Sequence, residues 1–383
     1  MYRLNILLSF LFSLNSYRVK DWRVWLLTFL GFSYALIIGF IIIQPTRLWF
    51  LQPKTDQVYS EMLEKHKNNV LVYVLDSGVE IDVNPWLSEH SVKGYNAIED
   101  TLDGTEDCSL HGTRVASVVG YNAEKENITV VPVKTAGCSL INDPAAIIRG
   151  INWIIDNHPK DAPIGVINIS SGYMDTVPFL DGIQNAVRSA LDAGFVVVAS
   201  AGNNSKVDTA SGKDKIADSC NEVPANVEGV ITVGAASLSF VEGNVQRATF
   251  SNSGACVSLF APGEQVKTSV KDSDGETILD YANGTSYAAP YVSAAVANKL
   301  AMFPLMLREE VTKAIKADAV ENVIVSNFAA PLEPNVNVSS ASKTPNLFLE
   351  YDFDKYKSFL DDYKDALQEC SIAESCISFY SPL

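Results

Sequence analysis

From residue 70 onward, short apolar runs alternate with segments whose pattern is helical. Continuous apolar strands separated by helices are typical of a parallel sheet that is covered on both faces. In such sheets the functional residues gather at the carboxyl ends of the strands. The sequence therefore predicts an α/β fold with a mainly parallel central sheet. The apolar runs are Val70–Leu75, Thr129–Val133, Gly165–Ile169, Phe195–Ala199 and Gly229–Val233, and the candidate helices are His111–Gly120, Pro144–His158, Pro178–Ala193 and Ser286–Met302.

The charge of the chain is unevenly distributed. The 383 residues carry 29 Lys and Arg against 45 Asp and Glu, a formal charge of −16. Residues 1–50 hold five basic residues and one acidic residue, so this end carries +4 and the remainder −20. A strongly acidic body repels nucleic acid, which argues against a nucleic-acid partner. A hydrophobic content of 47% excludes a disordered chain.

Val24–Ile43 form a 20-residue segment without charge. A helix of that length spans about 30 Å, the thickness of a bilayer's hydrocarbon core. Arg18, Lys20 and Arg23 precede it, so the positive-inside rule places the N-terminus in the cytosol and the rest of the chain on the lumenal or extracellular side. We expect a single-pass anchor. The alternative is a cleaved signal peptide, whose apolar region is usually shorter, and the function of the apolar segment Leu4–Leu14 stays open.

Three residues that can form a nucleophilic site lie at the ends of predicted elements. Asp76 follows the first apolar run, His111 begins one helix and Ser286 begins another. A serine hydroxyl is a weak nucleophile that needs an adjacent base, and the base needs a third group to hold its tautomer. The helix dipole behind Ser286 would favour a developing negative charge. We expect Pro290 to lie within the first turn of that helix, where its missing N–H costs little.

Eight stretches of this sequence, in order, resemble those of subtilisin-like serine peptidases of the proteinase K and aqualysin branch. This resemblance covers roughly residues 55–351 and implies a subtilisin-like three-layer fold, with helices on both faces of the sheet. The order Asp, His, Ser along the chain is also that of subtilisin. The stretches are VLDSGV around Asp76, HGTRVAS from His111, VINISSG at 166–172, VVASAGNN at 197–204, GVITVGAAS at 229–237, FSNSGACVSLFAPG at 250–263, NGTSYAAP at 283–290 and TPNLFLEY at 344–351.

The resemblance implies a role for each matching residue. Ser286 would be the nucleophile, His111 the general base, and Asp76 the group that orients His111. Asn203 would donate to the oxyanion that forms in the transition state. Two segments would bind an extended substrate by strand addition and wall the primary specificity pocket. These segments are Ser170, Ser171 and Gly172, and Ser200, Ala201 and Gly202.

The six cysteines all follow residue 107. The resemblance implies the disulfides Cys108–Cys138 and Cys220–Cys256, and we expect Cys370–Cys376 as a third pair in the tail. Disulfides need an oxidising compartment. This agrees with the lumenal or extracellular side that the basic residues before the predicted membrane segment indicate. Buried free thiols are the alternative.

Several positions depart from the pattern of this family. Only 32 residues separate Ile43 from Asp76, which leaves no room for the inhibitory propeptide that most secreted relatives carry. Ser258 stands where these relatives have an aspartate that ligates calcium, which weakens the expectation of that site, and catalysis itself needs no cofactor or metal. Ser117 replaces the usual Gly, Tyr287 the usual Met and Ser171 a usual Leu.

These observations predict the organisation of the chain. We expect a cytosolic N-terminus at 1–23, the transmembrane helix at 24–43, a linker at 44–54, a peptidase domain at 55–351 and a tail at 352–383. The predicted function is a membrane-anchored, monomeric serine endopeptidase that acts on proteins or peptides. The alternatives are an inactive subtilase fold that serves as a binding or regulatory module, and a secreted enzyme.

Other classes of enzyme lack support in the sequence. An aspartic peptidase needs two similar carboxylates, and the second candidate, Asp272, lacks an apolar run before it. The motifs of zinc peptidases, nucleotide-binding proteins and redox proteins are absent from the sequence. Of five Asn-x-Ser/Thr sites, we expect glycans at Asn127 and Asn337. A glycan is not expected beside the predicted cleft, at Asn168, Asn203 and Asn283.

Overall fold

The computed structural model describes residues 69–123, 126–139, 143–174, 180–206, 216–239, 244–321, 324–325 and 347–349. The predicted membrane segment at 24–43, the predicted tail and the pair Cys370–Cys376 lie outside these residues. Within the described part of the chain, none of the helices combines the length and the apolar character needed to cross a bilayer.

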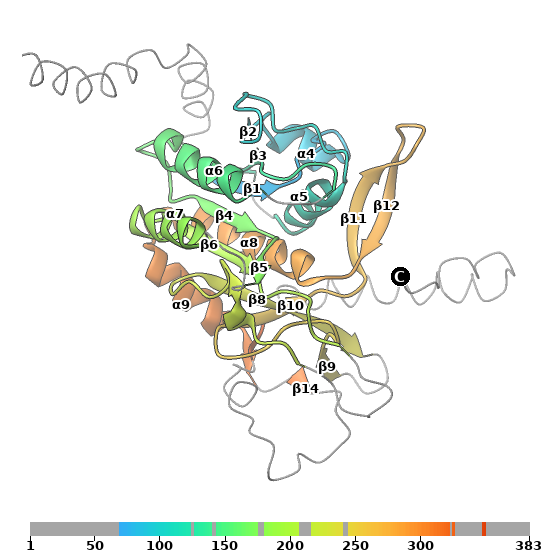
Figure 1. The fold of residues 1–383 in the computed structure, drawn as a ribbon, viewed down its shortest axis with the longest axis vertical. Coiled ribbons are helices and arrows are strands. Elements are labelled where there is room, and N and C mark those ends of the chain that lie inside the picture. Colours follow the sequence, from blue (N-terminus) through green and yellow to red (C-terminus); the bar gives the residue numbers. More distant parts are fainter. Residues whose placement is uncertain are drawn as a thin grey trace, which may run out of the picture. The chain divides into compact units, whose positions relative to one another are not determined.

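An eleven-stranded sheet runs through the centre of the described domain (Figure 1). Its strands lie in the order β13-β15-β10-β8-β6-β4-β1-β3-β2, with β9 paired to β8 and β14 paired to β9. The pairs from β10 to β2 are all parallel. The strands are β1 Val70–Asp76, β2 Tyr95–Asn96, β3 Ile128–Lys134, β4 Val166–Ile169, β6 Val196–Ser200, β8 Ile231–Ser239, β9 Asn244–Arg247, β10 Leu259–Pro262, β13 Val320–Glu321, β14 Ile324–Val325 and β15 Leu347–Phe348.

Helices cover both faces of this sheet, which confirms the predicted three-layer α/β fold (Figure 1). Helices α6 and α7 pack on one face, and α4, α5 and α8 pack on the other. Helix α9 packs against α8. The helices are α4 Pro85–His90, α5 His111–Asn122, α6 Pro144–Asn157, α7 Asp181–Asp192, α8 Thr285–Met302 and α9 Arg308–Asp318.

Strand β1 shows why its sequence is apolar without alternation. Successive side chains of a strand point to opposite faces. Val70, Val72 and Val74 pack in the core formed with α5 and α8. Leu71, Tyr73 and Leu75 pack in the core formed with α6 and α7. All six side chains are buried, so a polar residue at any of them would lose its hydration, and the whole run must be apolar.

The four predicted helices are present, and α5 and α6 begin at the predicted residues His111 and Pro144. Helix α7 begins at Asp181 rather than Pro178, and α8 begins at Thr285 rather than Ser286. The prediction that Pro290 lies in the first turn of α8 is wrong. Gly284 is the N-cap of this helix, so Pro290 is its sixth residue and lies in the second turn. A proline there removes a hydrogen bond to the carbonyl four residues earlier, which is that of Ser286.

Two short antiparallel ladders lie outside the main sheet. In the first, β5 (Tyr173–Met174) pairs with β7 (Glu222–Val223). In the second, β11 (Val266–Lys271) and β12 (Thr277–Ala282) form a hairpin that projects from the domain (Figure 1). An ion pair between Arg114 and Asp280, 2.8 Å from Nη2 to Oδ2, links this hairpin to α5. Neither ladder has a pattern that the sequence analysis detected.

The strand order creates a crevice at the carboxyl ends of β1 and β4. From β1 the chain adds β3 on one side of it, and then β4, β6 and β8 in succession on the other side. At such a switch point the connections leave in opposite directions, which opens a crevice where ligands bind. Asp76 is the last residue of β1, and Ser170 directly follows β4.

Candidate active site

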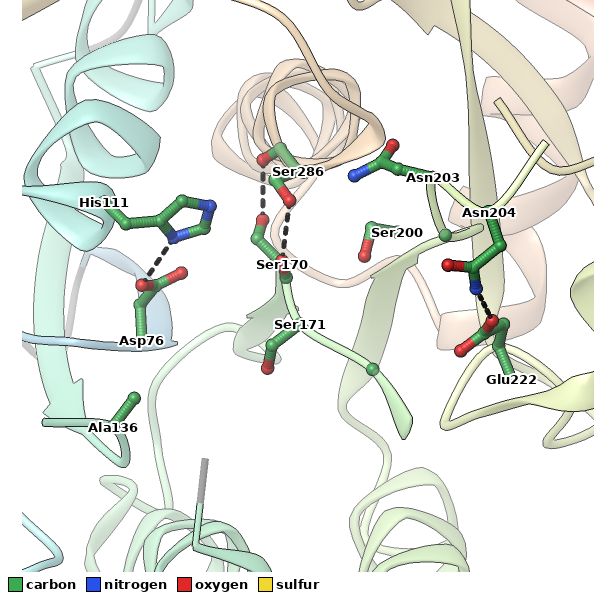
Figure 2. A pocket seen from close by; sticks show the side chains of 12 residues that line it. Asp76, His111, Ala136, Ser170, Ser171, Ser200, Asn203, Asn204, Glu222 and Ser286 are labelled. Atoms are coloured by element: carbon green, nitrogen blue, oxygen red, sulfur yellow. Dashed lines mark hydrogen bonds and ion pairs between the residues drawn. The ribbon is translucent and has the colours of Figure 1, made fainter. Parts of the chain in front are cut away.

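A pocket of about 270 Å³ lies at this crevice and brings together most of the predicted site residues (Figure 2). Ala201 is the one predicted member of the substrate segments that does not line it, because its side chain is buried in a small core with Phe260. The described residues that line the pocket are Asp76, His111, Ala136, Ser170, Ser171, Gly172, Ser200, Gly202, Asn203, Asn204, Glu222 and Ser286.

His111 and Asp76 form the central contact of the site. The Nδ1 atom of His111 lies 2.7 Å from Oδ1 of Asp76, and the carboxylate is 3% exposed. The same oxygen accepts a hydrogen bond from the backbone N–H of Ser77 at 2.8 Å, which holds the carboxylate in place. Figure 2 shows the other ring nitrogen of His111 turned toward Ser286. The contact therefore holds the imidazole with Nε2 facing the serine.

Burial would lower the pKa of His111, but its charge interaction and hydrogen bond with Asp76 outweigh burial. Asp107 adds a smaller interaction of the same sign. The pKa of His111 is therefore raised above its ordinary value of 6.5. A raised pKa makes the ring a stronger base, provided that the pH is high enough to keep it neutral.

A buried carboxylate shapes the loop that presents His111. Asp107 accepts hydrogen bonds from the backbone N–H groups of Leu110 at 3.0 Å and Thr113 at 2.8 Å, and from the Thr113 hydroxyl at 2.6 Å. These bonds satisfy N–H groups at the start of α5 that have no partner within the helix. Gly112 lets α5 approach the end of β1, since a Cβ atom there would lie 3.0 Å from Cβ of Asp76 and 2.1 Å from the carbonyl oxygen of Gly78, two residues after the strand. The loop and helix start are thus held against the strand that carries Asp76.

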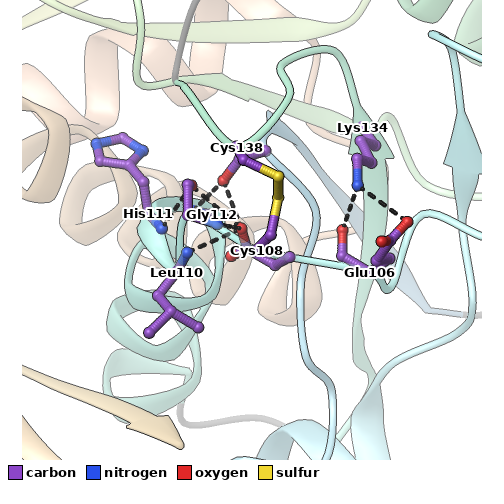
Figure 3. The surroundings of a disulfide bond; sticks show 10 residues. Glu106, Cys108, Leu110, His111, Gly112, Lys134 and Cys138 are labelled. Carbon is purple, nitrogen blue, oxygen red and sulfur yellow. Dashed lines mark hydrogen bonds and ion pairs between the residues drawn. A yellow bond between two sulfur atoms is a disulfide. The ribbon is translucent and has the colours of Figure 1, made fainter. Parts of the chain in front are cut away.

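The structure joins Cys108 to Cys138 and Cys220 to Cys256, the two pairs that the resemblance implies. The first bond lies three residues before His111 and ties its loop to the segment after β3 (Figure 3). Beside it, the Lys134 ammonium donates to the Glu106 carbonyl oxygen at 2.8 Å. The second bond holds the segment just before β7, which reaches the pocket at Glu222.

Replacing Cys220 and Cys256 together with Ser is expected to lower the free energy of unfolding by about 3–4 kcal/mol, because the bond closes a loop of 36 residues in the unfolded chain. Urea denaturation of the oxidised purified protein measures this loss. Wild-type protein treated with a reductant is the control and should lose at least as much. Equal stability of the oxidised wild type and the double variant would contradict the pairing. Free thiols at Cys220 and Cys256 in non-reducing peptide maps would contradict it as well.

Ser286 and Ser170 are joined by two reciprocal hydrogen bonds (Figure 2). The hydroxyl of Ser286 donates to the backbone carbonyl oxygen of Ser170 at 2.9 Å. The hydroxyl of Ser170 donates to the carbonyl oxygen of Ser286 at 2.8 Å, and this is the carbonyl that Pro290 leaves without its helical partner. The Ser286 hydroxyl can therefore reach His111 only if its side chain rotates away from Ser170. Catalytic hydrogen bonds commonly tighten only when substrate binds.

Asn203 is held by the start of α8. Its Oδ1 atom accepts hydrogen bonds from the backbone N–H and the hydroxyl of Thr285, both at 2.9 Å. With Oδ1 engaged on that side, the amide nitrogen points the other way, and Figure 2 shows it turned toward Ser286. The N–H groups of this amide are thus placed to donate to an acceptor beside the serine.

Three pocket residues were missed by the sequence analysis: Ala136, Asn204 and Glu222. The Asn204 amide donates to Oε1 of Glu222 (Figure 2). Glu222 follows a short helical turn and precedes a proline by two residues, a setting that carries no recognisable catalytic pattern. Asn204 could have been found, because it directly follows Asn203 in the matched stretch.

The residues that depart from the family pattern occupy defined positions. The Tyr287 ring centroid lies 5.7 Å from that of His111, and burial raises the pKa of Tyr287 to about 12. Ser117 accepts a hydrogen bond from the backbone N–H of Ser269 at 3.0 Å and so ties α5 to the hairpin. The hydroxyl of Ser171 is buried and has no hydrogen-bond partner among the described residues.

Ser258, which stands where the family pattern has a calcium-ligating aspartate, takes part in internal hydrogen bonds. The Ser258 hydroxyl accepts from the Thr232 N–H at 3.2 Å and donates to the Val230 carbonyl oxygen at 3.4 Å. A neutral hydroxyl that is engaged in this way does not fit a calcium ion, which prefers carboxylate and carbonyl oxygens. Across the residues that the structure describes, His, Cys, Asp and Glu form no group of three or more suited to a metal ion.

The fold and the pocket define an α/β protein with a serine, a histidine and an aspartate at the switch point of its sheet. The family model for the subtilase family matches residues 67–347. The chain belongs to the subtilase family.

Individual relatives agree with this assignment. The chain is 33% identical over 271 residues to an extracellular serine proteinase of Thermus sp. (strain Rt41A), covering 70% of this chain and 58% of that protein. It is 32% identical over 260 residues to alkaline serine exoprotease A of Vibrio alginolyticus, covering 67% of this chain and 41% of that protein. The crystal structure of a cold adapted subtilisin-like serine proteinase superposes with a TM-score of 0.58 at 28% identity, covering 74% of this chain and 89% of that one. The chain thus spans about half the length of the first two relatives.

Proposed function

We propose that this protein is a serine endopeptidase of the proteinase K and aqualysin branch. The observation that carries the proposal is the 2.7 Å contact between His111 and Asp76 in one pocket with Ser286 and Asn203. The names of the relatives support a serine-dependent peptidase, since one is called a serine proteinase and the other a serine exoprotease.

In the proposed mechanism, Ser286 attacks the carbonyl carbon of the peptide bond while His111 takes its proton. Asp76 keeps the proton on Nδ1 of His111 and stabilises the imidazolium. Asn203 donates to the carbonyl oxygen as it becomes an oxyanion. His111 then gives its proton to the leaving amine, and a water molecule hydrolyses the acyl-enzyme with the same groups in the same roles. We propose that this chemistry proceeds without a cofactor or metal and in a monomer.

Labelling with a fluorophosphonate tests the proposal. This reagent modifies a serine only where an adjacent base activates it, so mass spectrometry should find one adduct, on Ser286. Exposed serines such as Ser189 serve as internal controls and should stay unmodified. The absence of an adduct on Ser286, under conditions where another subtilase reacts, would favour the alternative of an inactive fold that serves as a binding or regulatory module.

The pH dependence of the reaction is a further prediction. His111 acts as a base only when neutral, and its pKa is raised above 6.5. We therefore expect kcat/KM for a peptide without charged side chains to fall as the pH drops, with a midpoint above 6.5. Asp76→Asn removes the main interactions that raise the pKa of His111. The residual activity of this variant should therefore begin to fall only at a lower pH than that of the wild type. A wild-type midpoint below 6.5 would contradict the raised pKa of His111.

We also propose that residues 24–43 anchor the protein in a membrane, with the peptidase domain at 55–351 and the tail at 352–383 on the lumenal or extracellular side. The uncharged segment and its basic flank support this arrangement, as do the cysteine pairs, which need an oxidising compartment. The Thermus relative is named as extracellular. Resistance to extraction with alkaline carbonate, together with the N-terminal sequence of the mature protein, separates a retained anchor from a cleaved signal peptide.

A further inference from the structure

We infer that Glu222 makes the pocket beside Ser286 a subsite for a cationic side chain, so that the preferred substrates carry Lys or Arg at the residue whose carbonyl is attacked. This inference rests on the proposed peptidase function and deepens it. Glu222 is the one carboxylate besides Asp76 among the described residues that line the pocket. Asp76 is already engaged by His111.

The backbone around Glu222 is fixed beside the predicted substrate segment. Strand β7 pairs with β5, which begins one residue after Gly172, in the register Met174 opposite Glu222 and Tyr173 opposite Val223. The disulfide of Cys220 restrains the chain two residues before Glu222. The carboxylate is therefore presented by a restrained segment, and only 5% of the residue is exposed.

The hydrogen bonds of Glu222 engage Oε1 and leave Oε2 facing the part of the pocket between Gly172 and Gly202, which we call the slot. Asn204 and Asn252 both donate to Oε1, the latter at 3.5 Å. Oε2 lies 3.6 Å from the point that a Cβ atom at Gly172 would occupy. On the other wall, a Cβ atom at Gly202 would lie 2.4 Å from Nδ2 of Asn252 and 3.2 Å from Cγ of Glu222. Both walls are therefore bare backbone where they come close to the glutamate, and Gly172, Gly202 and Glu222 line the same pocket.

His111 is the one basic side chain among the described residues that line the pocket, and it is paired with Asp76, so no Lys or Arg there neutralises the Glu222 carboxylate. Burial raises the pKa of the Glu222 carboxyl, and the hydrogen bonds from Asn204 and Asn252 only partly offset that effect. An ionised carboxylate in such a place is costly until a cation pairs with it. A Lys or Arg side chain of the substrate would supply that cation.

The arrangement of the site connects this slot to the reaction. In Figure 2, Ser286 lies between His111 on one side and Glu222 on the other, and Asn204 links Asn203 to the glutamate. A carbonyl carbon placed at Ser286, with its oxygen toward Asn203, puts the side chain of the same residue in the pocket that Glu222 lines. Glu222 would therefore select for a cationic side chain on the residue whose carbonyl is attacked.

A peptide series measures this preference in the full-length protein. We expect kcat/KM for chromogenic peptides ending in Arg or Lys before the cleaved bond to exceed that for the matching norleucine peptide. In Glu222→Gln the advantage of the cationic peptides should fall by at least about 30-fold, the effect of removing one partner of a buried charge pair. Cleavage of the norleucine peptide should fall less than cleavage of the cationic peptides, because only the cationic side chains lose a charge partner. Glu228→Gln, at an exposed position outside the pocket, is the matched control and should behave as wild type.

Binding of p-aminobenzamidine, followed by its fluorescence, separates the subsite from the catalytic machinery. We expect it to bind Ser286→Ala as tightly as wild type, and Glu222→Gln at least about 30-fold more weakly. Melting temperatures of the variants show whether each is folded. Labelling of Ser286 together with a preference for norleucine, and no binding of the cation, overturns the inference while leaving the peptidase function intact. Binding of the cation without labelling of Ser286 supports the subsite and rejects the peptidase.

Discussion

Ser286→Ala is expected to lower kcat for peptide hydrolysis about 10⁶-fold, to near the detection limit. This magnitude is taken from loss of the nucleophile in subtilisin, a member of the same family. The physical reason is that the remaining groups cannot form an acyl-enzyme, so only binding and oxyanion stabilisation persist. Burst and steady-state kinetics of the purified protein measure the loss.

The same substitution should leave the fold intact. It removes the hydrogen bond from the Ser286 hydroxyl to the Ser170 carbonyl oxygen, which contributes about 1 kcal/mol. The second bond of this pair uses the backbone carbonyl of Ser286 and survives. We expect a melting temperature within a few degrees of wild type. Ser189→Ala, at an exposed position on α7, is the matched control. Hydrolysis at the wild-type rate by Ser286→Ala would show that the nucleophile is misassigned.

Asn203→Asp is expected to lower kcat by about 10²–10³-fold or more with little change in KM. The range is taken from loss of the corresponding donor in subtilisin, in the same family. The substitution preserves size, and one carboxylate oxygen can still accept the two hydrogen bonds from Thr285. The other oxygen replaces the donor with an acceptor, so it repels the developing oxyanion instead of stabilising it. The effect should therefore appear in the transition state and not in substrate binding.

Separate measurements of kcat and KM test this prediction. Asn185→Asp, on the exposed side of α7, introduces the same charge away from the pocket and should change neither constant. Thr285→Ala should give a smaller loss of kcat than Asn203→Asp, because it removes only one of the two bonds that orient the amide. An unchanged kcat in Asn203→Asp would mean that another group binds the oxyanion.

The positions of Asp76, His111 and Ser286 could be predicted because each lies where a local pattern changes. Asp76 follows a run of buried side chains, and the two others lie at helix starts. Asp272, the second candidate carboxylate for an aspartic peptidase, lies in the turn of the hairpin and does not line the pocket. Asn168 is fully buried and hydrogen-bonded to Ser170 and Ser293, which excludes a glycan there.

Other parts of the site could not be predicted because no local pattern encodes them. Asp107 looks like an ordinary polar loop residue, yet it accepts the N–H groups at the start of α5. Pro290 lies one turn later than expected, and its effect appears only through Ser170, which is 116 residues away from Ser286 in sequence. Such contacts depend on which chain segments the fold brings together.

The sequence by itself predicted the three-layer fold, because burial on both faces of a parallel sheet leaves continuous apolar runs, and it predicted the residues of the proposed triad through their resemblance to the subtilase motifs. Only the tertiary structure decided what surrounds the triad. The two-residue ladder between β5 and β7 brings Glu222 to the pocket from a segment about 50 residues beyond the substrate segment. A ladder that short has too few residues to show a period. The charge of the pocket was therefore set by strand pairing, a long-range contact that neither composition nor spacing reveals.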